Sequence, residues 1–476
     1  MIETREHYVG GAWVAPLEGR EHHVIDPSTE EEAVLILLAG PADVDRAVAA
    51  ARGALPAWSA TEPGERRAVV ERVVEQYRRR QGDLAEAISR EMGAPIDFAR
   101  ASQATSFLWH AENFLAAFEH VERLRPLGDH APHDRIALEP VGVAALITPW
   151  NWPANQIALK VIPALLAGCT AVLKPSEQAP LSAVVVAEML HEAGVPPGVF
   201  NMVQGDGAGA GSRLSSHPGV DMVSFTGSTR AGRAITVAAA DTFKRVTLEL
   251  GGKGANLVFA DADERAVERG VRHVMGNAGQ SCNAPSRMLV ERPLYEAAVE
   301  TARAVAEGTK VGPSHEPGPH IGPVVNARQW EHVQGLIQKG IEEGARLVAG
   351  GPGRPEHLNR GFFVRPTVFA DVRPGMAIER EEIFGPVLSM IPFDTEEEAV
   401  AIANDTAYGL TNYVQSADEA RRHRLARQLK SGMVEMNGKS RGRGSPFGGV
   451  KASGRAREGG VWGIEEFLDV KAISGW

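Results

Sequence analysis

Short apolar runs alternate with amphipathic stretches along most of the chain, and the pattern changes near residue 141. Before that point, residues 42–60 and 64–93 are rich in Ala, Glu and Arg at helical spacing, with a break at Glu62-Pro63-Gly64. After it, short strands and helices follow one another, which predicts parallel βαβ units with helices on both faces of a sheet. The expected strands are Val141–Ile147, Thr170–Leu173, Phe200–Val203 and Met222–Phe225, and the expected helices are Asn155–Leu166 and Ser182–Ala193.

A second block with the same alternation follows Gly251. Its expected elements are strands at Ala255–Phe259, Arg287–Val290 and Val387–Phe393 and a helix at Leu294–Ala306. Two such blocks predict an α/β protein with two Rossmann-like three-layer lobes, and the cleft between them is the usual meeting place of cofactor and substrate. Residues 119–140 fit neither block, and their Pro, Arg and His content suggests an extended excursion.

Composition excludes several classes of function. The chain has 476 residues, of which 43% are hydrophobic and 23% charged, as in an ordinary globular protein of two or three domains. The formal net charge of -10, without a concentrated basic stretch, argues against nucleic-acid binding. The N-terminus carries no apolar signal core, and the longest apolar run, Val141–Ile147, is too short to cross a bilayer. We therefore expect a cytoplasmic protein without a membrane partner.

The two cysteines differ in their surroundings. They cannot form a disulfide framework, and nothing near them has metal-ligand spacing, so no metal is expected. Cys169 enters an apolar strand and fits a buried structural residue. Cys282 lies among small polar residues in Asn277-Ala278-Gly279-Gln280-Ser281-Cys282-Asn283. That context favours an exposed turn with an activated thiolate, although a buried inert cysteine is the common alternative.

Two further residues, Glu249 and Asn151, lie in sequence contexts that suit a catalytic role. Glu249 stands between two leucines and before Gly251-Gly252, where partial burial would raise its pKa towards that of a general base. The alternative is an exposed carboxylate at a strand end. Asn151 lies between two tryptophans in Thr148-Pro149-Trp150-Asn151-Trp152-Pro153, and a rigid side-chain amide there is suited to donate a hydrogen bond to an oxyanion. The alternative is that Asn151 is an ordinary turn residue without a catalytic role.

Three segments carry weaker signals for a dinucleotide cofactor. Lys174-Pro175-Ser176-Glu177 closes a strand, and an acidic residue there accepts hydrogen bonds from a ribose and repels a 2′-phosphate. The glycine-rich segment 205–211 lacks the strict G-x-G-x-x-G spacing. Phe225-Thr226-Gly227-Ser228-Thr229 ends a strand and opens a helix, which suits a pyrophosphate on backbone N–H groups.

In their order and spacing these segments resemble the aldehyde dehydrogenase superfamily over nearly the whole chain. The order is what makes the resemblance specific, because no single motif is decisive. The matching segments are the Asn151 turn, Lys174-Pro175-Ser176-Glu177, Phe225-Thr226-Gly227-Ser228, Leu248-Glu249-Leu250-Gly251-Gly252-Lys253, Gly279-Gln280-Ser281-Cys282, Glu381-Glu382-Ile383-Phe384-Gly385-Pro386-Val387 and Pro446-Phe447-Gly448-Gly449-Val450-Lys451.

The resemblance implies NAD-dependent oxidation of an aldehyde to a carboxylic acid. It makes Cys282 the nucleophile, Glu249 the base that activates water, Asn151 an oxyanion donor and Lys160 a proton-transfer residue. Glu177 alone favours NAD, so NADP remains an alternative. The expected cofactor contacts are Thr148, Trp150, Lys174, Glu177, Gly207, Phe225, Gly227, Ser228, Leu250, Gly251, Glu382 and Phe384.

The expected substrate pocket departs from the family's usual pattern. Trp152 replaces the commoner Phe, which should narrow the tunnel, and the wall is unusually polar. The loop 437–445 adds Lys439, Arg441 and Arg443, which would attract a substrate carboxylate, as in a semialdehyde acid. Alternatively, these cations point to solvent or pair with a neighbouring subunit. The expected pocket residues are Trp152, Asn155, Gln156, Leu159, Ser281, Asn283 and Arg441.

The resemblance also implies domains and partners. Residues 1–121 and 141–248 would form the NAD-binding domain and residues 249–452 the catalytic domain. Segments 122–140 and 465–476 would form a small β extension that joins subunits in a homo-oligomer, a dimer or a tetramer. Two rival functions are a CoA-acylating dehydrogenase and a non-catalytic structural protein that binds the cofactor. Glu249 disfavours the first, and the presence of all three reacting side chains disfavours the second.

Overall fold

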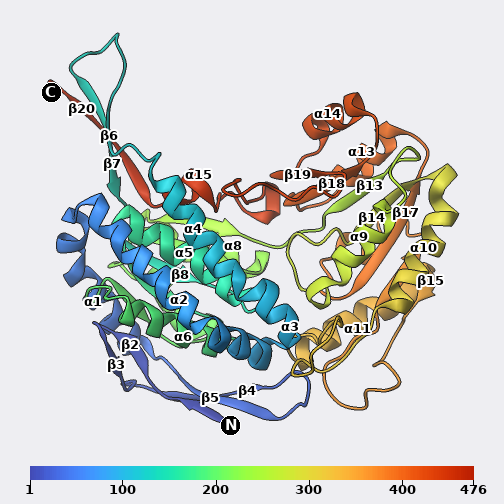
Figure 1. Ribbon diagram of the computed structural model, residues 1–476, viewed down its shortest axis with the longest axis horizontal. Helices are drawn as coiled ribbons and strands as arrows, with labels where there is room; N and C mark the ends of the chain where they lie inside the picture. The colour runs from blue at the N-terminus through green and yellow to red at the C-terminus, as the bar shows by residue number, and fades with distance from the viewer.

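The computed structural model describes residues 1–476, and each of its two lobes is built around a seven-stranded sheet (Figure 1). The first sheet has the order β12-β11-β8-β9-β10-β2-β3, with β8 to β12 parallel and β2 and β3 antiparallel at one edge. The chain runs outwards from β8 to β10 and then returns to the other side of β8 at β11. A ligand crevice is expected at the carboxyl end of such a switch point. The strands are β2 (His7–Val9), β3 (Ala12–Val14), β8 (Val143–Ile147), β9 (Thr170–Lys174), β10 (Phe200–Met202), β11 (Met222–Thr226) and β12 (Arg245–Glu249).

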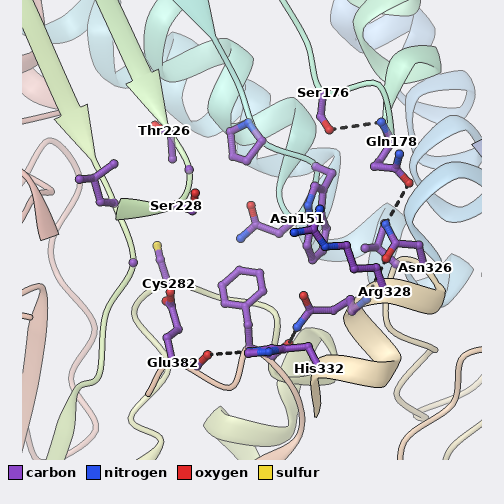
Figure 2. Close-up of a pocket in the computed structure, with 18 of the residues that line it drawn as sticks. Asn151, Ser176, Gln178, Thr226, Ser228, Cys282, Asn326, Arg328, His332 and Glu382 are labelled. Carbon is purple, nitrogen blue, oxygen red and sulfur yellow. Dashed lines mark hydrogen bonds between the residues drawn. The ribbon is translucent and has the colours of Figure 1, made fainter. Parts of the chain in front are cut away.

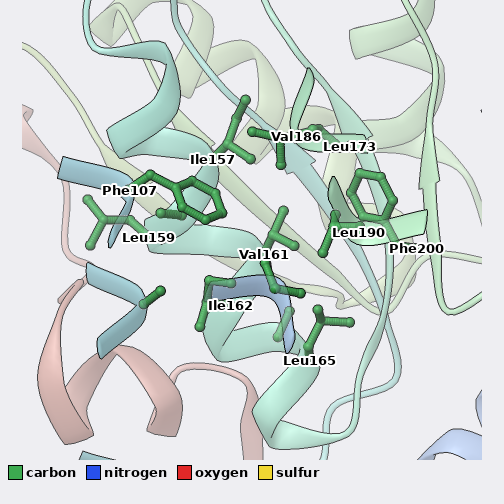
Figure 3. Packing of buried hydrophobic residues seen from close by; sticks show 14 of the residues in the cluster. Phe107, Ile157, Leu159, Val161, Ile162, Leu165, Leu173, Val186, Leu190 and Phe200 are labelled. Carbon is green, nitrogen blue, oxygen red and sulfur yellow. The ribbon is translucent and has the colours of Figure 1, made fainter. Parts of the chain in front are cut away.

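Helices cover both faces of this sheet, and the larger core lies beneath α5. This helix is buried along nearly its whole length, because α4 and α2 pack on it from outside (Figure 3). Each fully buried leucine or isoleucine in it contributes about 1.5–3 kcal/mol. The helices are α1 (Pro41–Ala60), α2 (Pro63–Met92), α3 (Ile96–Phe98), the π-helical turn η1 (Ala99–Gln103), α4 (Thr105–Phe118), α5 (Pro153–Ala167), α6 (Pro180–Glu192), the π-helical turn η2 (Gly207–Gly211), α7 (Ser212–Ser216), α8 (Thr229–Ala239), the 3-10 turn η3 (Ala240–Thr242) and α15 (Gly460–Glu465).

The second sheet has the order β15-β16-β17-β14-β13-β18-β19 and is parallel except for β15. Separate apolar clusters lie on its two faces. Its strands are β13 (Ala255–Val258), β14 (Arg287–Glu291), β15 (Arg346–Ala349), β16 (Thr367–Ala370), β17 (Val387–Phe393), β18 (Thr411–Gln415) and β19 (Met433–Met436). Its helices are α9 (Ala266–Met275), the 3-10 turn η4 (Gly276–Gly279), the 3-10 turn η5 (Arg292–Leu294), α10 (Tyr295–Gly308), α11 (Ala327–Glu342), α12 (Ala377–Arg380), α13 (Glu396–Asn404), α14 (Glu419–Gln428) and the 3-10 turn η6 (Lys451–Ser453).

Two small sheets complete the molecule. β20 (Leu468–Ser474) pairs antiparallel with β7 (Asp134–Pro140), which also pairs with β6 (Leu124–Pro126). This hairpin and the C-terminus project away from both lobes (Figure 1). Near the N-terminus, β1 (Ile2–Thr4), β5 (Glu32–Leu38) and β4 (Arg20–Ile25) form the other sheet.

The two-lobed α/β fold expected from the sequence is confirmed, and the expected strands and helices agree with the observed ones to within a few residues. The excursion expected at 119–140 contains β6 and β7. None of the helices combines the length and apolarity that crossing a bilayer requires.

Candidate active site

Two cavities meet at Cys282. The first, of about 580 Å³, lies at the switch point of the first sheet, and the second, of about 330 Å³, lies between α4, α5 and the loop that follows β19. Cys282 and Gln156 line both. Figure 2 shows Cys282 in the first cavity with Asn151 and Ser228 above it and Glu382 below it in that view. A side chain at such a junction can react with a molecule in one cavity while another occupies the second.

A strained turn carries Cys282 to this junction. Asn277 and Ala278 adopt left-handed conformations with φ of 52° and 53°, so α9 ends abruptly and the chain turns into the cleft. Gln280 braces the turn, because its Oε1 accepts from the N–H of Val325 at 2.9 Å and its Nε2 donates to the carbonyl of Asn277 at 3.2 Å. Such strain persists only where the surrounding structure holds it.

The thiol differs from the sequence-based expectation of an activated thiolate. Burial, reinforced by the carboxylates of Glu382 and Glu249, raises the pKa of Cys282 to about 12. The sequence pattern correctly indicated a turn of small residues, but it could not show that carboxylates gather around the sulfur. That direction opposes the thiolate, and activation of Cys282 stays a prediction.

Asn151 follows β8 and is held from three sides. Its Nδ2 donates to the carbonyl of Gln280 at 2.9 Å, and its own carbonyl accepts from Gln103 and Asn277, each at 3.0 Å. Gln103 also donates to the side-chain oxygen of Asn277 at 3.1 Å. The amide of Asn151 is therefore fixed relative to the cysteine turn, and its second N–H remains available for a ligand.

Glu249, at the end of β12, is 2% exposed and neither of its carboxylate oxygens has a hydrogen-bond partner. Burial and the nearby Glu458 raise its pKa well above the usual range, although Lys160 lowers it. The carboxylate fits there because Gly448 has no side chain: a Cβ on Gly448 would lie 2.6 Å from Oε1 of Glu249. The exposed alternative is therefore wrong. Glu249 lies behind the cavities rather than in their lining.

Lys160 and Glu458 form a buried ion pair beside Glu249. The Nζ of Lys160 lies 2.7 Å from Oε1 of Glu458 and 3.0 Å from Oγ of Ser224. The second oxygen of Glu458 has no hydrogen-bond partner, and Glu458 lines the second cavity. Sequence reasoning found Lys160 but missed Glu458, because its sequence neighbourhood has no distinguishing pattern.

Eight of the twelve expected cofactor residues line the first cavity: Trp150, Glu177, Gly227, Ser228, Leu250, Gly251, Glu382 and Phe384. Trp150 and Phe384, from different lobes, meet edge to face with ring centroids 5.5 Å apart. Ser228 caps the N-terminus of α8, with its Oγ accepting from the N–H of Ala231. The helix dipole and free N–H groups there favour an anion.

The other four expected cofactor residues lie elsewhere. Thr148 and Phe225 are buried in or beside their strands, and Gly207 lies in the turn η2 outside the cavity lining. Lys174 is 3% exposed, and its Nζ donates to the carbonyls of Pro175 and Gly205, both at 2.6 Å. Lys174 therefore stabilises the loop that carries Glu177. A direct contact of Thr148, Phe225, Gly207 or Lys174 with the cofactor stays a prediction.

The lining fits a dinucleotide. Glu382 is half-buried, and its Oε1 accepts from the N–H of Gly252 at 2.8 Å, which leaves the other oxygen beside Gly251. Gly252 must lack a side chain because the carbonyl of Cys282 lies against it. Glu177, at the opposite end, is half-buried and 3.8 Å from the Nζ of Lys174. Carboxylates near both ends and a helix N-terminus between them match two ribose diols and a pyrophosphate.

Six of the seven expected substrate-pocket residues line the second cavity: Trp152, Asn155, Gln156, Leu159, Asn283 and Arg441. Ser281 does not line it. Ser281 instead accepts a hydrogen bond from Nε1 of Trp152 at 2.9 Å and so fixes the indole. Arg441 lies there as expected, but its Nε is 2.8 Å from Oε1 of Glu435 in the same chain. Neither alternative considered for the basic loop included that partner.

Sequence reasoning missed residues of both cavities. The second cavity takes Trp109, His110, Asn113 and Phe114 from α4, and the first takes Arg328, Gln329 and His332 from α11. The positions on α4 are one and four residues apart, which places them on one face of the helix. That periodicity was visible, but nothing local distinguished a cavity-facing stripe from a core-facing one.

Comparison with known proteins agrees with this geometry. A model described as the aldehyde dehydrogenase family matches residues 13–473. A 3-succinoylsemialdehyde-pyridine dehydrogenase from a Pseudomonas species is 48% identical over 481 residues, covering 100% of this chain and 99% of that protein. The crystal structure of an aldehyde dehydrogenase from Bartonella henselae is 56% identical with a TM-score of 0.99, covering 100% of both chains. A mutant of aldehyde dehydrogenase C from Pseudomonas syringae, complexed with NAD+ and octanal, is 47% identical with a TM-score of 0.97, covering 99% of this chain and 96% of that one.

Proposed function

Because this chain belongs to the aldehyde dehydrogenase family, we propose that it oxidises an aldehyde to the carboxylic acid with NAD as oxidant and water as acyl acceptor. The observation that carries this proposal is the position of Cys282 at the junction of two cavities, with the fixed amide of Asn151 beside it and the buried carboxylate of Glu249 behind it. A nucleophile, an oxyanion donor and a base are the groups that acyl chemistry requires.

We assign the first cavity to NAD. Ser228 and the N-terminus of α8 would face the pyrophosphate, Glu177 the adenosine ribose and Glu382 the nicotinamide ribose. When bound, NAD supplies the acceptor for the hydride that leaves the substrate carbon. Crystallised relatives from Pseudomonas syringae and Mycobacterium tuberculosis are complexed with NAD+. The carboxylate of Glu177 would repel a 2′-phosphate, which favours NAD over NADP.

The chain's own residues divide the reaction between them. The sulfur of Cys282 attacks the aldehyde carbon to form a thiohemiacetal, after its proton has passed by way of Glu249 to the pair of Lys160 and Glu458. The oxyanion that forms accepts hydrogen bonds from Nδ2 of Asn151 and the N–H of Cys282. After oxidation to the thioester, Glu249 takes a proton from water, which attacks the acyl carbon and releases the acid. The high pKa of Glu249 makes it a stronger base than an exposed carboxylate.

We propose that Lys160 and Glu458 exchange protons with Glu249 between turnovers. The pair lies beside the base, and Glu458 also lines the second cavity, so a proton received by Glu249 has a polar path to the substrate side. The unpartnered second oxygen of Glu458 is the acceptor that such a path requires.

The unpartnered carboxylate of Glu249 favours hydrolysis over acyl transfer to CoA, because transfer to a thiol does not require a base that activates water. Retention of Cys282, Glu249 and Asn151 in one place argues against a purely structural role. A reducing, cytoplasmic setting suits a mechanism that depends on a free thiol.

We also propose the division into domains given above and a homo-oligomer. The sheet of β6, β7 and β20 carries exposed Leu124, Leu127 and Val470, and Phe243, directly after the turn η3, is 96% exposed. Apolar side chains in these positions are suited to contact a second copy of the chain. Light scattering on a size-exclusion column should give a mass of at least two chains, and Val470→Asp should lower it.

Absorbance at 340 nm tests the proposed reaction with aldehyde, NAD or NADP, with and without CoA. We expect NADH to form without CoA, the product acid to gain one oxygen from ¹⁸O-labelled water, and Cys282→Ala to abolish turnover. Glu249→Gln should give about one NADH per active site and then slow by about 10²–10⁴-fold, since thioester hydrolysis loses its base. Turnover that requires CoA, or that survives Cys282→Ala, would contradict the proposal.

A further inference from the structure

Two arginines line the first cavity from opposite lobes. Arg230 is the second residue of α8, in the first lobe, and Arg328 is the second residue of α11, in the second lobe. Both side chains are exposed, and neither guanidinium forms a hydrogen bond or an ion pair within the chain. Arg441 in the second cavity differs, because it is paired with Glu435. The first cavity therefore has two guanidinium groups that are free to bind a ligand.

Contacts on both sides of Arg328 fix the start of α11 along the cavity. Asn326 caps the helix, with its Oδ1 accepting from the N–H of Gln329 at 2.9 Å, and its Nδ2 donates to Oε1 of Gln178 at 3.0 Å. Nε2 of Gln329 donates to the carbonyl of Phe384 at 3.0 Å. The backbone of Arg328 is therefore anchored between a loop of the first lobe and a loop of the second, although its own side chain is free.

These anchors place Arg328 near the middle of the proposed cofactor. One of the two loops carries Glu177, which we assign to the adenosine ribose, and the other carries Glu382, which we assign to the nicotinamide ribose. In a dinucleotide the pyrophosphate lies between the two riboses. Figure 2 shows Arg328 across the cavity from Ser228, which caps α8. The pyrophosphate would therefore lie between Arg328 and the N-terminus of α8.

Arg230 approaches the same region from the first lobe. It lies in the first turn of α8, two residues after Ser228, where free N–H groups and the helix dipole already favour an anion. A guanidinium there adds a full positive charge and can donate two parallel hydrogen bonds to phosphate oxygens. The carboxylates of Glu177 and Glu382 in the same lining would repel a dianion. The two arginines supply the charge that offsets this repulsion.

We propose that Arg230 and Arg328 bind the pyrophosphate of NAD from its two sides, so that the bound cofactor bridges the two lobes. This inference rests on the proposed function and assigns a role in it to two residues that the sequence motifs do not include. Through Arg328 the cofactor is held against the lobe that carries Cys282. The two arginines thereby determine cofactor affinity without contacting the reacting atoms.

Calorimetric titration with ADP-ribose tests the inference without turnover, because this compound has the pyrophosphate of NAD and lacks the nicotinamide. Arg328→Gln and Arg230→Gln should each raise the Kd for ADP-ribose by about 5–10-fold, and the double variant should raise it by at least about 25-fold. Arg328→Lys keeps the charge but loses the planar fork of donors, so the Kd should rise by only about 2–3-fold.

Arg233→Gln is the matched control. Arg233 is also exposed and unpaired on α8, one turn after Arg230, but it does not line the cavity. Its substitution removes the same charge and should change the Kd for ADP-ribose by less than about 2-fold, because an exposed charge without direct contact is screened by water and salt. A loss in Arg233→Gln as large as in Arg230→Gln would overturn the inference.

Salt separates the effect of charge from an effect on packing. Raising NaCl from about 50 to about 500 mM should weaken ADP-ribose binding by the wild-type protein more than by either Arg230→Gln or Arg328→Gln. An equal salt dependence in all three proteins would mean that neither guanidinium acts through its charge, and would contradict the proposal.

A second probe distinguishes the pyrophosphate from a 2′-phosphate. Addition of a 2′-phosphate to ADP-ribose should leave the fold-change caused by Arg328→Gln and by Arg230→Gln the same, even though Glu177 weakens binding of the modified compound to every variant. A loss confined to the 2′-phosphorylated compound would assign the arginines to NADP and overturn the inference. So would an unchanged Kd for ADP-ribose in either single variant.

The same measurements distinguish failure of the inference from failure of the proposed function. Cysteine-dependent formation of NADH, with ADP-ribose bound equally well by Arg328→Gln and the wild-type protein, would overturn the inference alone. If the wild-type protein bound neither ADP-ribose nor NAD and oxidised no aldehyde, the proposed function would be wrong.

Discussion

The two cavities that meet at Cys282 are built in different ways. The first is lined mainly by strand ends and by turns that follow them, such as Asn151 after β8 and Gly227 after β11. The second is lined mainly by helix faces of α4 and α5 and by the loop after β19. Residues at the ends of parallel strands make up most of the first lining, whereas side chains on helix faces and in a loop make up most of the second. The first is thus suited to an invariant cofactor and the second to a substrate that can change by substitution.

The largest predicted effect concerns the sulfur shared by both cavities. With the pKa of Cys282 near 12, the thiolate fraction rises tenfold per pH unit below that value. Alkylation by iodoacetamide in the absence of cofactor should therefore accelerate about 10³-fold from pH 7 to pH 10, measured by mass spectrometry of the Cys282 peptide. Cys282→Ala controls for Cys169, which is buried. A rate that levels off near pH 8 would mean that the surrounding carboxylates do not control the thiol.

Removal of the oxyanion donor should be the next largest effect. Asn151→Ala should lower kcat by about 10²–10³-fold, since one preformed donor contributes that much to a charged transition state. The affinity for NAD, measured by calorimetry, should change by less than about 3-fold, although Asn151 lines the first cavity. A large loss of affinity with unchanged kcat would assign Asn151 to the cofactor.

Gln103, the last residue of η1, tests whether this turn positions the reacting groups. Gln103→Leu removes donors to the carbonyl of Asn151 and to the side chain of Asn277, and should lower kcat about 10-fold with little change in KM for NAD. The control is Gln81→Leu, a partly exposed glutamine on α2 that reaches Thr105 near the same turn. If both variants lose the same thermal stability and only Gln103→Leu lowers kcat, Gln103 positions the reacting groups. An unchanged kcat in Gln103→Leu would contradict that role.

The smallest predicted effect lies at the far end of the first cavity. Glu177→Gln keeps the shape and removes the charge that opposes a 2′-phosphate, so the ratio of kcat/KM for NADP to that for NAD should rise about 5-fold. The KM for the aldehyde, which we assign to the second cavity, should not change. If it did, the two cavities would not be independent.

Much of the site could be predicted from sequence because the relevant residues lie at strand ends and in sharp turns. Cys282, Glu249 and Asn151 lie in short segments whose glycines, prolines and aromatics mark sharp turns, and Ser228 follows a strand and opens a helix. Local backbone geometry determines where such residues point, and local sequence determines that geometry. The expected strands and the two-lobed α/β fold followed from the same local alternation of apolar and polar positions.

The sequence by itself determined the fold class, and it predicted which short segments lie around the two cavities. Only the tertiary structure decided the burial of Glu249, the ion pair of Lys160 and Glu458 beside it, and the pairing of Arg441 in the second cavity. Glu458 reaches Lys160 across 298 positions of the chain, whereas Glu435, in β19, pairs with Arg441 in the loop that follows the same strand. Electrostatic fields depend on distances in space and on burial, and neither follows from neighbours in sequence.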